Sequence, residues 1–456
     1  MELKVFDKYS KSLLGTTELA TAEAVEEVLL GATKSFQELK KTSAGERSAW
    51  LRSLASLIQR DSQRLAGLIT AEAGKPISYS LGEVARSVTT LNFAADECLK
   101  FGGEVVGVDF GAGAGKQAYT QRFPIGPILG IAPFNFPLNL ILHKLGPALA
   151  VGAPTIIKPS LYTPLTALAL EELASEAGIP KSAFQVVVCE NELCEKILLD
   201  ERVKAFSFTG SPKVGWDLKA KVPKKKTTLE LGGNAAVIVD QTADLNLAVN
   251  AIASGAFLYS GQICISTQRI FIQDEIYNKF LNMLTEKVES LKVGDPHDPA
   301  TIVGPLIDPL HMTRVSDWVN EAVDAGAQVH CGGEAFDEEH GLYKPTLISD
   351  AKNELRIVCE EVFGPVAVLQ KFGHFSHALE EVNKSKFGLQ AGVFTNRLDH
   401  MKQAFNELEV GGVMINNVPG FRVDSMPYGG VKESGFGREG IRYAMEEMTE
   451  EKLLVF

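Results

Sequence analysis

The stretch AFSFTGSPKVGWDLKAK, residues 205–221, decides the fold, because a β-strand in it passes directly into an α-helix. Residues 205–209 follow the pattern of a short strand, and Gly210 allows the chain to turn after it. Ser211 is typical of a helix N-cap, and Pro212 fits the first helical turn. The start of such a helix can bind a pyrophosphate, because its first N–H groups have no partner in the helix. An ordinary strand-to-helix turn uses the same residues, so this stretch alone leaves the ligand open.

Strand and helix patterns alternate on both sides of this stretch. Further strands are predicted at 128–132, 155–158, 185–189 and 235–239, and further helices at 138–151 and 164–177. Such alternation is typical of a parallel, doubly wound sheet. A second unit of the same class follows Gly232, with helices predicted at 277–292 and 315–325 and strands at 269–273, 366–371 and 413–416.

The first hundred residues are predicted to be mainly helical, since apolar side chains recur at helical spacing over 22–40, over 46–69 and on to about Lys100. The glycine-rich segment 102–115 that follows fits neither of the common phosphate-loop spacings. We therefore interpret it as a loop entering a hairpin, and residues 117–122 as an exposed strand.

The length and net charge of the chain limit the classes of protein to which it can belong. A chain of 456 residues is long enough for two or three domains, and its net charge of −12 argues against nucleic acid as a partner. The N-terminus lacks the basic-then-apolar pattern of a signal peptide. The most apolar region, residues 125–157, is interrupted by five prolines and by Asn135, Asn139, His143 and Lys144, which indicates a buried core segment rather than a membrane span. We predict a soluble, cytoplasmic protein.

Cys264 is the one cysteine of six that we single out. None of the six lies in a CxxC pair and no compact metal-ligand spacing occurs, so no metal is predicted. Five are interpreted as buried, reduced thiols. Cys264 falls in a loop between a helical run and the strand at 269–273, where a thiol can act as a nucleophile. An inert thiol is the alternative.

Two charged side chains end predicted strands. Glu230 stands between leucines and before two glycines, and a carboxylate in such apolar surroundings can serve as a general base. Lys158 closes an apolar strand before a proline, which suits contact with a ribose hydroxyl or a phosphate. For both residues a solvent-facing strand end is the alternative.

Taken together, the motifs resemble those of the aldehyde dehydrogenase superfamily, nearly end to end from about residue 10. The matching stretches, in order, are APFNFP (132–137), IIKPS (156–160), FTGS (208–211), LELGG (229–233), GQIC (261–264), EEVFGP (360–365) and PYGG (427–430). The resemblance implies two doubly wound α/β domains with a small β oligomerisation element. It places an NAD(P)-binding domain at 1–115 and 131–231, a catalytic domain at 232–415 and the oligomerisation element at 116–130 and 440–456.

The resemblance also implies a role for individual residues. Cys264 occupies the position of the nucleophile, Glu230 that of the general base and Asn135 that of an oxyanion donor. The implied cofactor is NAD or NADP. Its expected contacts are Ala132, Pro133, Phe134, Lys158, Ser160, Ser211, Leu231, Glu361 and Phe363. Of these, Lys158 and Glu361 match the residues that hold the two riboses, and Ser211 one beside the pyrophosphate.

The implied reaction is oxidation of an aldehyde to a carboxylate through a thioester on Cys264, hydrolysed with Glu230 as the base. Three alternatives remain open: a CoA-acylating member, a non-enzymatic structural member of the fold, and a cofactor-free thiol hydrolase. Members of the superfamily that act by CoA transfer usually lack the glutamate found here at 230, which favours hydrolysis. A homodimer or homotetramer is expected.

Two departures from the superfamily pattern concern specificity. Leu161 replaces a glutamate that many NAD-preferring members carry, so NADP can be admitted and the cofactor preference stays open. Arg422 aligns with a loop that lines the substrate tunnel, and a guanidinium there suits an anionic group. The stretch 421–440 is similar to members acting on lactaldehyde, semialdehydes or glyceraldehyde 3-phosphate, so we expect a small polar or anionic aldehyde. The alternative for Arg422 is a surface arginine paired with Asp424.

Overall fold

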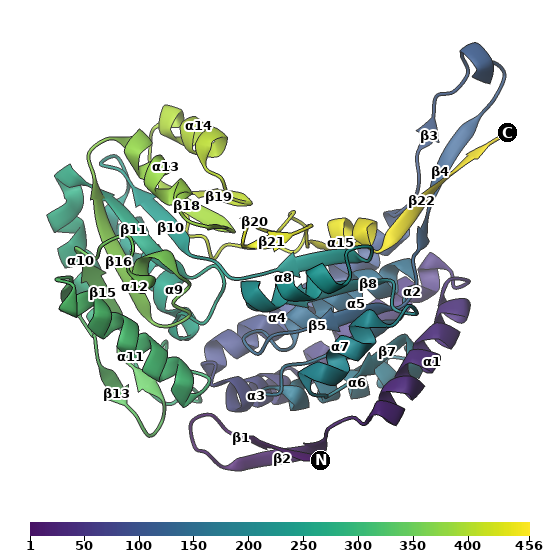
Figure 1. The fold of residues 1–456 in the computed structure, drawn as a ribbon, viewed down its shortest axis with the longest axis horizontal. Helices are drawn as coiled ribbons and strands as arrows, with labels where there is room; N and C mark the ends of the chain where they lie inside the picture. The colour runs from purple at the N-terminus through teal and green to yellow at the C-terminus, as the bar shows by residue number, and fades with distance from the viewer.

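A six-stranded sheet organises the first lobe of the computed structural model, which describes residues 1–456 (Figure 1). Its order is β21-β9-β8-β5-β6-β7. The strands are β5 (Ile128–Ile131), β6 (Thr155–Lys158), β7 (Phe184–Val186), β8 (Ala205–Thr209), β9 (Lys226–Glu230) and β21 (Gly435–Phe436). All are parallel except β21, which pairs antiparallel with β9. The predicted parallel sheet is therefore confirmed, with one extra strand contributed from near the C-terminus.

Helices bury both faces of this sheet. They are α1 (Ala22–Leu39), α2 (Ala44–Arg60), α3 (Ser62–Ala73), α4 (Ile77–Lys100), α5 (Asn139–Val151), α6 (Pro164–Glu176), α7 (Asn191–Leu199) and α8 (Pro212–Lys221). Apolar residues of α2 to α6 form one core with the sheet, and those of α1 and α7 form a second core on the other face. Burial on both faces explains the nearly unbroken apolar runs of β5 and β6.

The helix predicted over 46–69 is two helices. α2 ends at Arg60 and α3 begins at Ser62, with Asp61 between them in a non-helical conformation. Both neighbouring arginines, Arg60 and Arg64, bind the Asp61 carboxylate. The apolar spacing continues across this corner because Ile58 and Leu65 enter the same core. Periodicity alone therefore did not reveal the break.

A seven-stranded sheet organises the second lobe, in the order β12-β15-β16-β11-β10-β18-β19. Its strands are β10 (Ala235–Val239), β11 (Thr267–Gln273), β12 (Gln328–Cys331), β15 (Thr346–Ser349), β16 (Val366–Phe372), β18 (Gln390–Phe394) and β19 (Gly412–Ile415). Only β12 runs antiparallel to its neighbour. The flanking helices are α9 (Leu245–Phe257), α10 (Tyr277–Glu289), α11 (Pro309–Asp324), α12 (Arg356–Cys359), α13 (Phe375–Asn383) and α14 (Leu398–Glu407).

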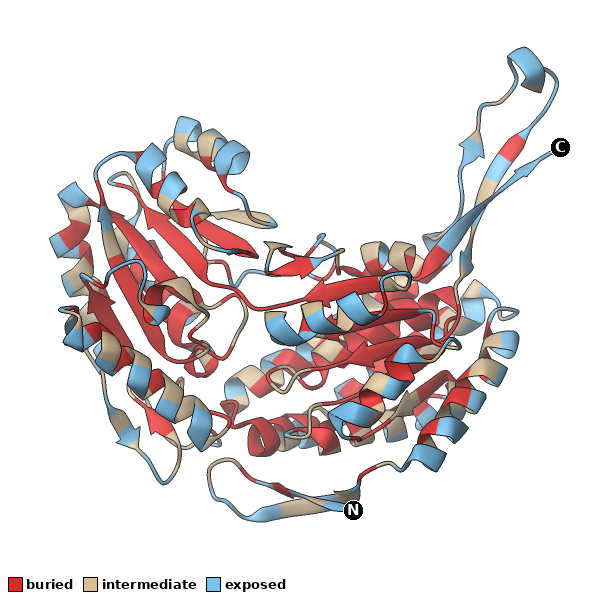
Figure 2. Cartoon of the chain, viewed as in Figure 1, coloured by how far each residue is buried: buried red, intermediate tan, exposed pale blue.

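Alternate residues of β10 enter opposite cores in this lobe. Val237 and Val239 pack with α9 and α10, whereas Ala236 and Ile238 pack with α13 and α14. Figure 2 shows the resulting pattern of buried strands behind half-exposed helices in both lobes. The two helix-covered sheets confirm the predicted α/β class.

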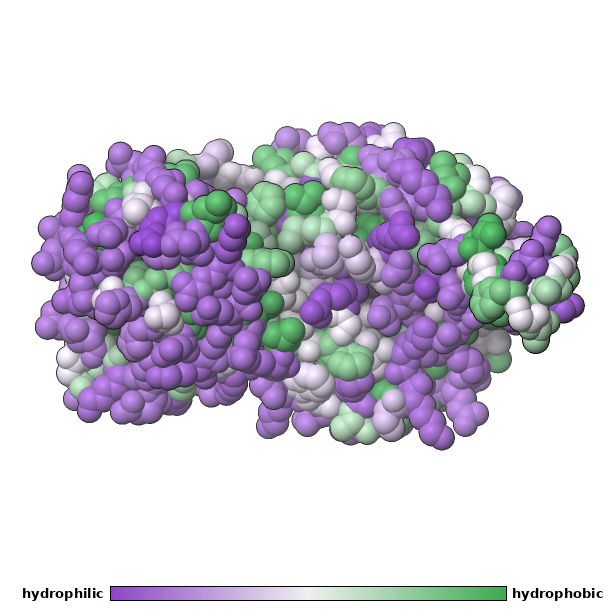
Figure 3. All heavy atoms as spheres, turned by 90° about the horizontal axis from the view of Figure 1, so that it is seen from above, coloured by the Kyte–Doolittle hydropathy of each residue, from purple (hydrophilic) through white to green (hydrophobic).

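An arm projects from the first lobe. It is a three-stranded sheet of β3 (Val105–Val106), β4 (Ala118–Pro124) and β22 (Thr449–Val455), which follows helix α15 (Ile441–Glu447) (Figure 1). The glycine-rich segment forms its exposed tip, which confirms the hairpin interpretation. β22 lies at the edge of this sheet. Exposed apolar side chains gather on the arm (Figure 3): Val105, Phe110, Tyr119, Leu453, Leu454, Val455 and Phe456.

The remaining strands form short pairs: β1 (Glu2–Phe6) with β2 (Leu13–Glu18), β13 (Ala335–Asp337) with β14 (Leu342–Tyr343), and β17 (Phe387–Gly388) with β20 (Val431–Lys432). None of the helices has the length and the apolar character needed to cross a membrane.

The two parallel sheets place opposite edges toward one another. β9 ends at Glu230 and β10 begins at Ala235, with four residues between them, so the carboxyl edge of the first sheet is joined to the amino edge of the second. Asn135 follows β5 at the carboxyl edge, and Cys264 precedes β11 at the amino edge. The carboxyl edge of a parallel sheet is where ligands commonly bind.

Candidate active site

Cys264 lies in a loop whose backbone is strained. Tyr259 and Ser260 have φ values of 49° and 57°, and Gly261 has a φ of 68°. A Cβ on Gly261 would lie 2.2 Å from the carbonyl oxygen of Gly364, so only glycine fits there. Hydrogen bonds from Ser260 Oγ to the Gly304 carbonyl (2.6 Å) and from Ile307 N to Gln262 Oε1 (2.9 Å) hold the turn. Strain of this kind persists only where the surroundings fix it, and it is common at active sites.

Asn135 links the loop after β5 to the Cys264 loop. Its side-chain Nδ2 donates to the carbonyl oxygen of Gln262 over 2.9 Å. One N–H of the amide is engaged in this way and the second remains available. The side chain is buried, and its Oδ1 has no hydrogen-bond partner. The amide is therefore fixed beside the Cys264 backbone with a donor to spare.

Glu230 is buried at the end of β9, at 4% exposure, and neither carboxylate oxygen has a hydrogen-bond partner. This excludes the solvent-facing alternative. Burial raises the pKa of Glu230 well above its ordinary value of 4.5, and the charge of Glu439 raises it further. Arg422 and Lys144 act in the opposite direction without cancelling the effect.

Glu439 has the opposite balance of charges. Burial alone would raise its pKa, but Lys144 and Arg422 hold it at about 2. Lys144 Nζ lies 3.3 Å from Glu439 Oε1, and Arg422 Nη2 lies 3.0 Å from Glu439 Oε2. The pKa values of the two carboxyl groups thus differ sharply: Glu439 stays ionised, whereas Glu230 favours the protonated form. Such a separation is typical of acid–base sites.

The Cys264 thiol lies 3.4 Å from the hydroxyl of Tyr428. Burial raises the pKa of the thiol to about 12, and the hydrogen bond with Tyr428 lowers it. The charges of Glu361 and Glu230 both raise that pKa. Glu230 lies near the sulfur in the fold, because a Cβ on Gly429 would lie 3.0 Å from Glu230 Oε1 and the preceding residue, Tyr428, contacts the thiol. The site thus stabilises the neutral thiol rather than the thiolate.

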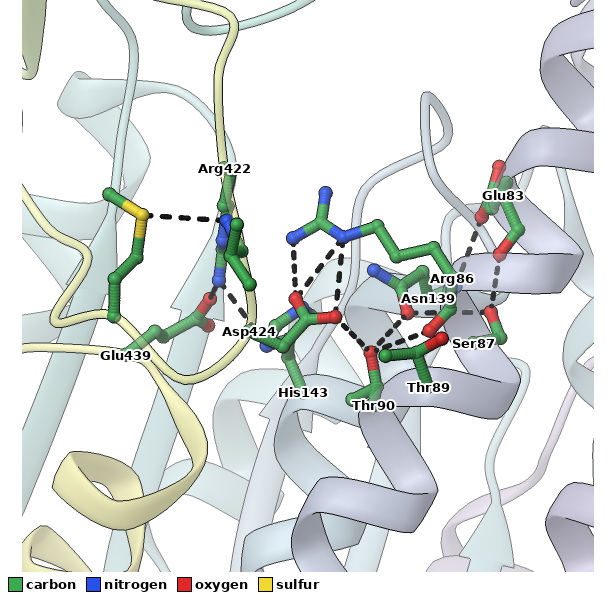
Figure 4. Close-up of polar contacts among 12 residues, drawn as sticks. Glu83, Arg86, Ser87, Thr89, Thr90, Asn139, His143, Arg422, Asp424 and Glu439 are labelled. Carbon is green, nitrogen blue, oxygen red and sulfur yellow. Dashed lines mark hydrogen bonds and ion pairs between the residues drawn. The ribbon is translucent and has the colours of Figure 1, made fainter. Parts of the chain in front are cut away.

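Arg422 is buried, with a side-chain exposure of 6%, and its guanidinium lies 3.6 Å from the centre of the Tyr428 ring. It pairs with Glu439 instead of Asp424, so the alternative of a surface pair with Asp424 is wrong. Asp424 is bound by Arg86, whose Nη2 lies 2.6 Å away, and by His143, whose Nε2 lies 3.0 Å away. Figure 4 shows this row of side chains from Glu439 to Asp424 and on to Asn139 on α5.

The residues expected to hold a dinucleotide come from the carboxyl edge of the first sheet and from the segment before β16 of the second. Lys158 is buried, and the only hydrogen bond of its ammonium is a 3.4 Å contact with Asn191 Oδ1, which leaves its other side-chain donors available. Glu361 accepts from Gly233 N over 3.0 Å, and burial raises its pKa to about 7. Phe363, at φ 45°, lies edge-on to Phe134 at 5.9 Å.

The other expected contacts lie between these residues. Ala132 N donates to the Lys158 carbonyl, and Leu231 is buried against Gly215. Pro133 and Ser160 are partly exposed. Ser211 has the backbone of an N-cap, but its side chain makes no capping hydrogen bond, so the expectation of a side-chain cap is wrong. An exposed hydroxyl and the free N–H groups of α8 suit a pyrophosphate, so this set of residues fits the cofactor.

Sequence reasoning missed Lys144, His143, Tyr428, Arg86 and Glu439. Lys144 and His143 were visible only as interruptions of an apolar run, yet both are at most 2% exposed. A charged residue inside an apolar helix is buried only when it is paired. The position of Lys144 in such a helix could therefore have predicted a buried partner. Arg86 and Glu439 gave no such signal: Arg86 lies 338 residues from Asp424 and Glu439 lies 295 residues from Lys144, and no sequence pattern pairs Glu439 with the nearer Arg422.

The aldehyde dehydrogenase family model matches residues 1–454 of this chain. The chain therefore belongs to the aldehyde dehydrogenase family, and it is an oxidoreductase that converts aldehydes to acids with NAD(P).

Named relatives and solved structures agree over the full length. The chain is 41% identical to the 3-sulfolactaldehyde dehydrogenase of Priestia aryabhattai, over 100% of this chain and 94% of that protein. It is 38% identical to aldehyde dehydrogenase 21 of Physcomitrella patens, solved with the reaction product succinate, with a TM-score of 0.97 over 100% and 95% of the two chains. It is 35% identical to the glyceraldehyde-3-phosphate dehydrogenase of Methanocaldococcus jannaschii, solved with NADP, with a TM-score of 0.94 over 100% and 98%.

The environment of the thiol predicts its reactivity. Because the pKa of Cys264 is about 12, its alkylation by iodoacetamide should accelerate with pH up to at least pH 10 without a plateau. Tyr428→Phe removes the hydrogen bond that lowers this pKa, so alkylation at pH 9 should slow several-fold. Mass spectrometry of the Cys264 peptide measures the rate. Tyr277→Phe, a buried tyrosine of the second lobe, is the matched control. A plateau near pH 8 would contradict the assignment.

Proposed function

We propose that Cys264, Asn135 and Glu230 catalyse the NAD(P)-dependent oxidation of a small anionic aldehyde through a thioester on Cys264. The observation that carries this proposal is Glu230: a buried carboxylate with no partner stands within electrostatic reach of the only thiol in the site. Burying such a group costs stability, and it is kept where chemistry uses it.

In the first step the sulfur of Cys264 attacks the aldehyde carbon. Negative charge then develops on the aldehyde oxygen, where the free N–H of the Asn135 amide and the backbone N–H of Cys264 stabilise it. Asn135 is held by Gln262, so its donor needs no reorganisation during the attack. The resting thiol gives up its proton to solvent as the sulfur attacks, so this step does not require Glu230.

When bound beside Cys264, NAD(P) would supply the hydride acceptor for the adduct on that residue. Lys158, Glu361, Ser211 and the edge-on rings of Phe134 and Phe363 would hold it. Glu230 then takes a proton from water, which attacks the thioester and releases the acid. Its raised pKa suits this exchange of protons near neutral pH.

Charge in the site supports an anionic substrate. The Arg422 guanidinium lies on the ring of Tyr428, whose hydroxyl touches the Cys264 sulfur, and Arg422 Nε has no hydrogen-bond partner. Arg86 is a second cation in the same row, and Figure 4 shows its third nitrogen pointing away from Asp424. The names of the relatives point the same way: a sulfonated aldehyde and a phosphorylated one, and a dicarboxylate product.

Hydrolysis is favoured over transfer of the acyl group to CoA, because Glu230 is kept in the position of the base. The presence of both Cys264 and Glu230 likewise argues against a purely structural member of the fold. A hydrolase without a cofactor would have no use for the dinucleotide residues at the carboxyl edge.

We also propose a homodimer or homotetramer built through the arm. β22 and β19 are both edge strands, and an open strand edge pairs readily with another strand. The exposed apolar residues of the arm would be covered in such an assembly.

All six cysteines are free, which supports a cytoplasmic location.

The role of Glu230 is tested by Glu230→Gln. The variant should retain the first burst of reduced cofactor and lose steady-state turnover by at least about 100-fold, because only hydrolysis needs the base catalytically. In the wild type, turnover should rise with pH as the carboxylate form is populated, and the variant should lose this rise. Stopped-flow absorbance measures both phases, with Cys264→Ser as the burst-free control. Equal loss of burst and turnover would contradict the assignment.

The substrate proposal is tested by Arg422→Ala. A charge-assisted hydrogen bond contributes about 1.5–3 kcal/mol, so the ratio of kcat/KM for succinic semialdehyde over propionaldehyde should fall roughly 10–100-fold. Loss of the Glu439 pair affects both substrates alike and cancels in the ratio. Arg422→Lys, which keeps the charge, is the matched control. An unchanged ratio would overturn this role.

The assembly is tested by deleting residues 450–456. Removal of most of β22 exposes the edge of β4 and should convert the oligomer to a monomer of half the mass or less in multi-angle light scattering. Glu450→Ala, which leaves the strand in place, serves as the control. If the truncated chain keeps the wild-type mass, the arm is not the interface.

A further inference from the structure

An ion pair that touches no reacting group is completely buried behind the site. Lys75 Nζ lies 2.5 Å from Glu83 Oε2, and both side chains are 0% exposed. Lys75 belongs to the corner between α3 and α4, residues 73–76, and Glu83 lies two turns into α4. A buried pair of charges often costs more in desolvation than it returns, so its presence calls for a function.

Glu83 fixes the loop that carries Asn135. Its second oxygen, Oε1, accepts hydrogen bonds from the backbone N–H groups of Leu138 and Asn139, both over 3.0 Å. These N–H groups belong to the start of α5, only three and four residues after Asn135. A carboxylate at a helix start is favoured by the helix dipole as well as by the bonds. Figure 4 shows Glu83 at the end of the row that reaches Asn139.

Lys75 contacts both loops of the site. Its ammonium lies 3.6 Å from the centre of the Phe136 ring, next to Asn135, and 5.1 Å from the centre of the Tyr259 ring, in the strained turn before Cys264. Cation–π attraction is strongest where water is excluded, as it is here. Tyr259 also donates from its hydroxyl to the carbonyl of Ala73 over 2.7 Å, which ties the turn to the same corner.

The corner reaches the Cys264 loop by a second route. A Cβ on Gly304 would lie 2.6 Å from the Gly74 carbonyl oxygen, so the two backbones are in close contact. The Gly304 carbonyl accepts from Ser260, and the Pro305 carbonyl accepts from Gln262 Nε2 over 3.2 Å. Gln262 in turn accepts from Asn135. The corner, the strained turn and the Asn135 loop therefore form one closed set of contacts.

We propose that Lys75 and Glu83 are positioning residues that set the place of the Asn135 amide relative to the Cys264 sulfur. This inference rests on the roles proposed above for Asn135 and Cys264. Glu83 fixes the backbone after Asn135, and Lys75 holds Phe136 and Tyr259 on either side. Together they fix the distance and orientation between the Asn135 amide and the Cys264 sulfur. A misplacement of about 1 Å in such a pair costs about 100-fold in rate.

Glu83→Gln tests the proposal. The amide keeps the shape and an acceptor oxygen but presents N–H groups to the Lys75 ammonium. We expect the rate constant for acylation of Cys264 by p-nitrophenyl acetate, which needs no cofactor, to fall about 10–100-fold. The burst rate with aldehyde and NAD(P) should fall equally, because the same oxyanion donors act in both. The dissociation constant for NAD(P), measured by fluorescence, should stay within about twofold.

Glu72→Gln is the matched control. Glu72 is equally buried and caps α6 in the same manner, by accepting from Leu165 N (2.7 Å) and Thr166 N (2.8 Å), but it contacts neither loop of the site. Its replacement should lower the melting temperature without changing the acylation rate constant. If Glu83→Gln behaves in the same way, the burst amplitude falls because fewer molecules are folded, but the acylation rate constant of the folded molecules stays unchanged. In that case the pair is merely structural and the proposal is overturned.

Lys75→Met combined with Glu83→Gln keeps the test decisive if the single variant does not fold, because the double variant leaves no unpaired charge. It should fold and still acylate at least about 10-fold more slowly than the wild type; a wild-type rate constant would overturn the proposal. Mass spectrometry of the acetylated wild type distinguishes a failure of the proposed nucleophile, Cys264, from a failure of the positioning role proposed for Lys75 and Glu83. Acetylation on a residue other than Cys264 refutes the proposed nucleophile, whereas acetylation on Cys264 with unaffected variants refutes only the role of the ion pair.

Discussion

The site depends on one buried carboxyl group that has no partner. Glu230 is buried at a sheet edge without any hydrogen-bond partner, while Glu439 takes both nearby cations, Lys144 and Arg422. Two carboxylates cannot both be stabilised by this set of partners, so one remains ionised and the other is left with a raised pKa. The distribution of partners, rather than the carboxylate itself, makes Glu230 a group that can accept and return a proton.

The opposed sheet edges explain how distant segments reach one point. The carboxyl edge of the first sheet supplies Asn135, Lys158 and Glu230, and the amino edge of the second supplies Cys264 and Glu361. Gly232 and Gly233 lie between the edges. A side chain on Gly232 would lie 2.2 Å from the Glu361 carboxylate, and one on Gly233 would lie 2.2 Å from the Cys264 carbonyl oxygen. The glycines after Glu230 therefore permit the close approach of both lobes.

Strain and buried charge lie together in this protein. Tyr259, Ser260 and Phe363 have positive φ values beside the thiol and the dinucleotide residues. Each such conformation costs on the order of 1–3 kcal/mol and must be fixed by its neighbours. The Lys75–Glu83 pair and the hydrogen bonds of Ser260 and Gln262 supply that support for the turn that contains Tyr259 and Ser260. These contacts thus fix the turn before Cys264 and the loop that contains Asn135.

The parallel α/β class, the order of the strands along the chain and the candidate thiol and carboxylate could be predicted from the amino-acid sequence, and the family resemblance added the candidate amide. These follow from local patterns: period-two and helical spacing, turn residues, and short motifs read in order. The folded structure was needed to show that Arg422 pairs with Glu439, that Asp61 breaks a helix and that Lys144 and Glu439 meet across nearly three hundred residues. Such pairings depend on which surfaces the fold buries against one another, and no local spacing in the chain records that.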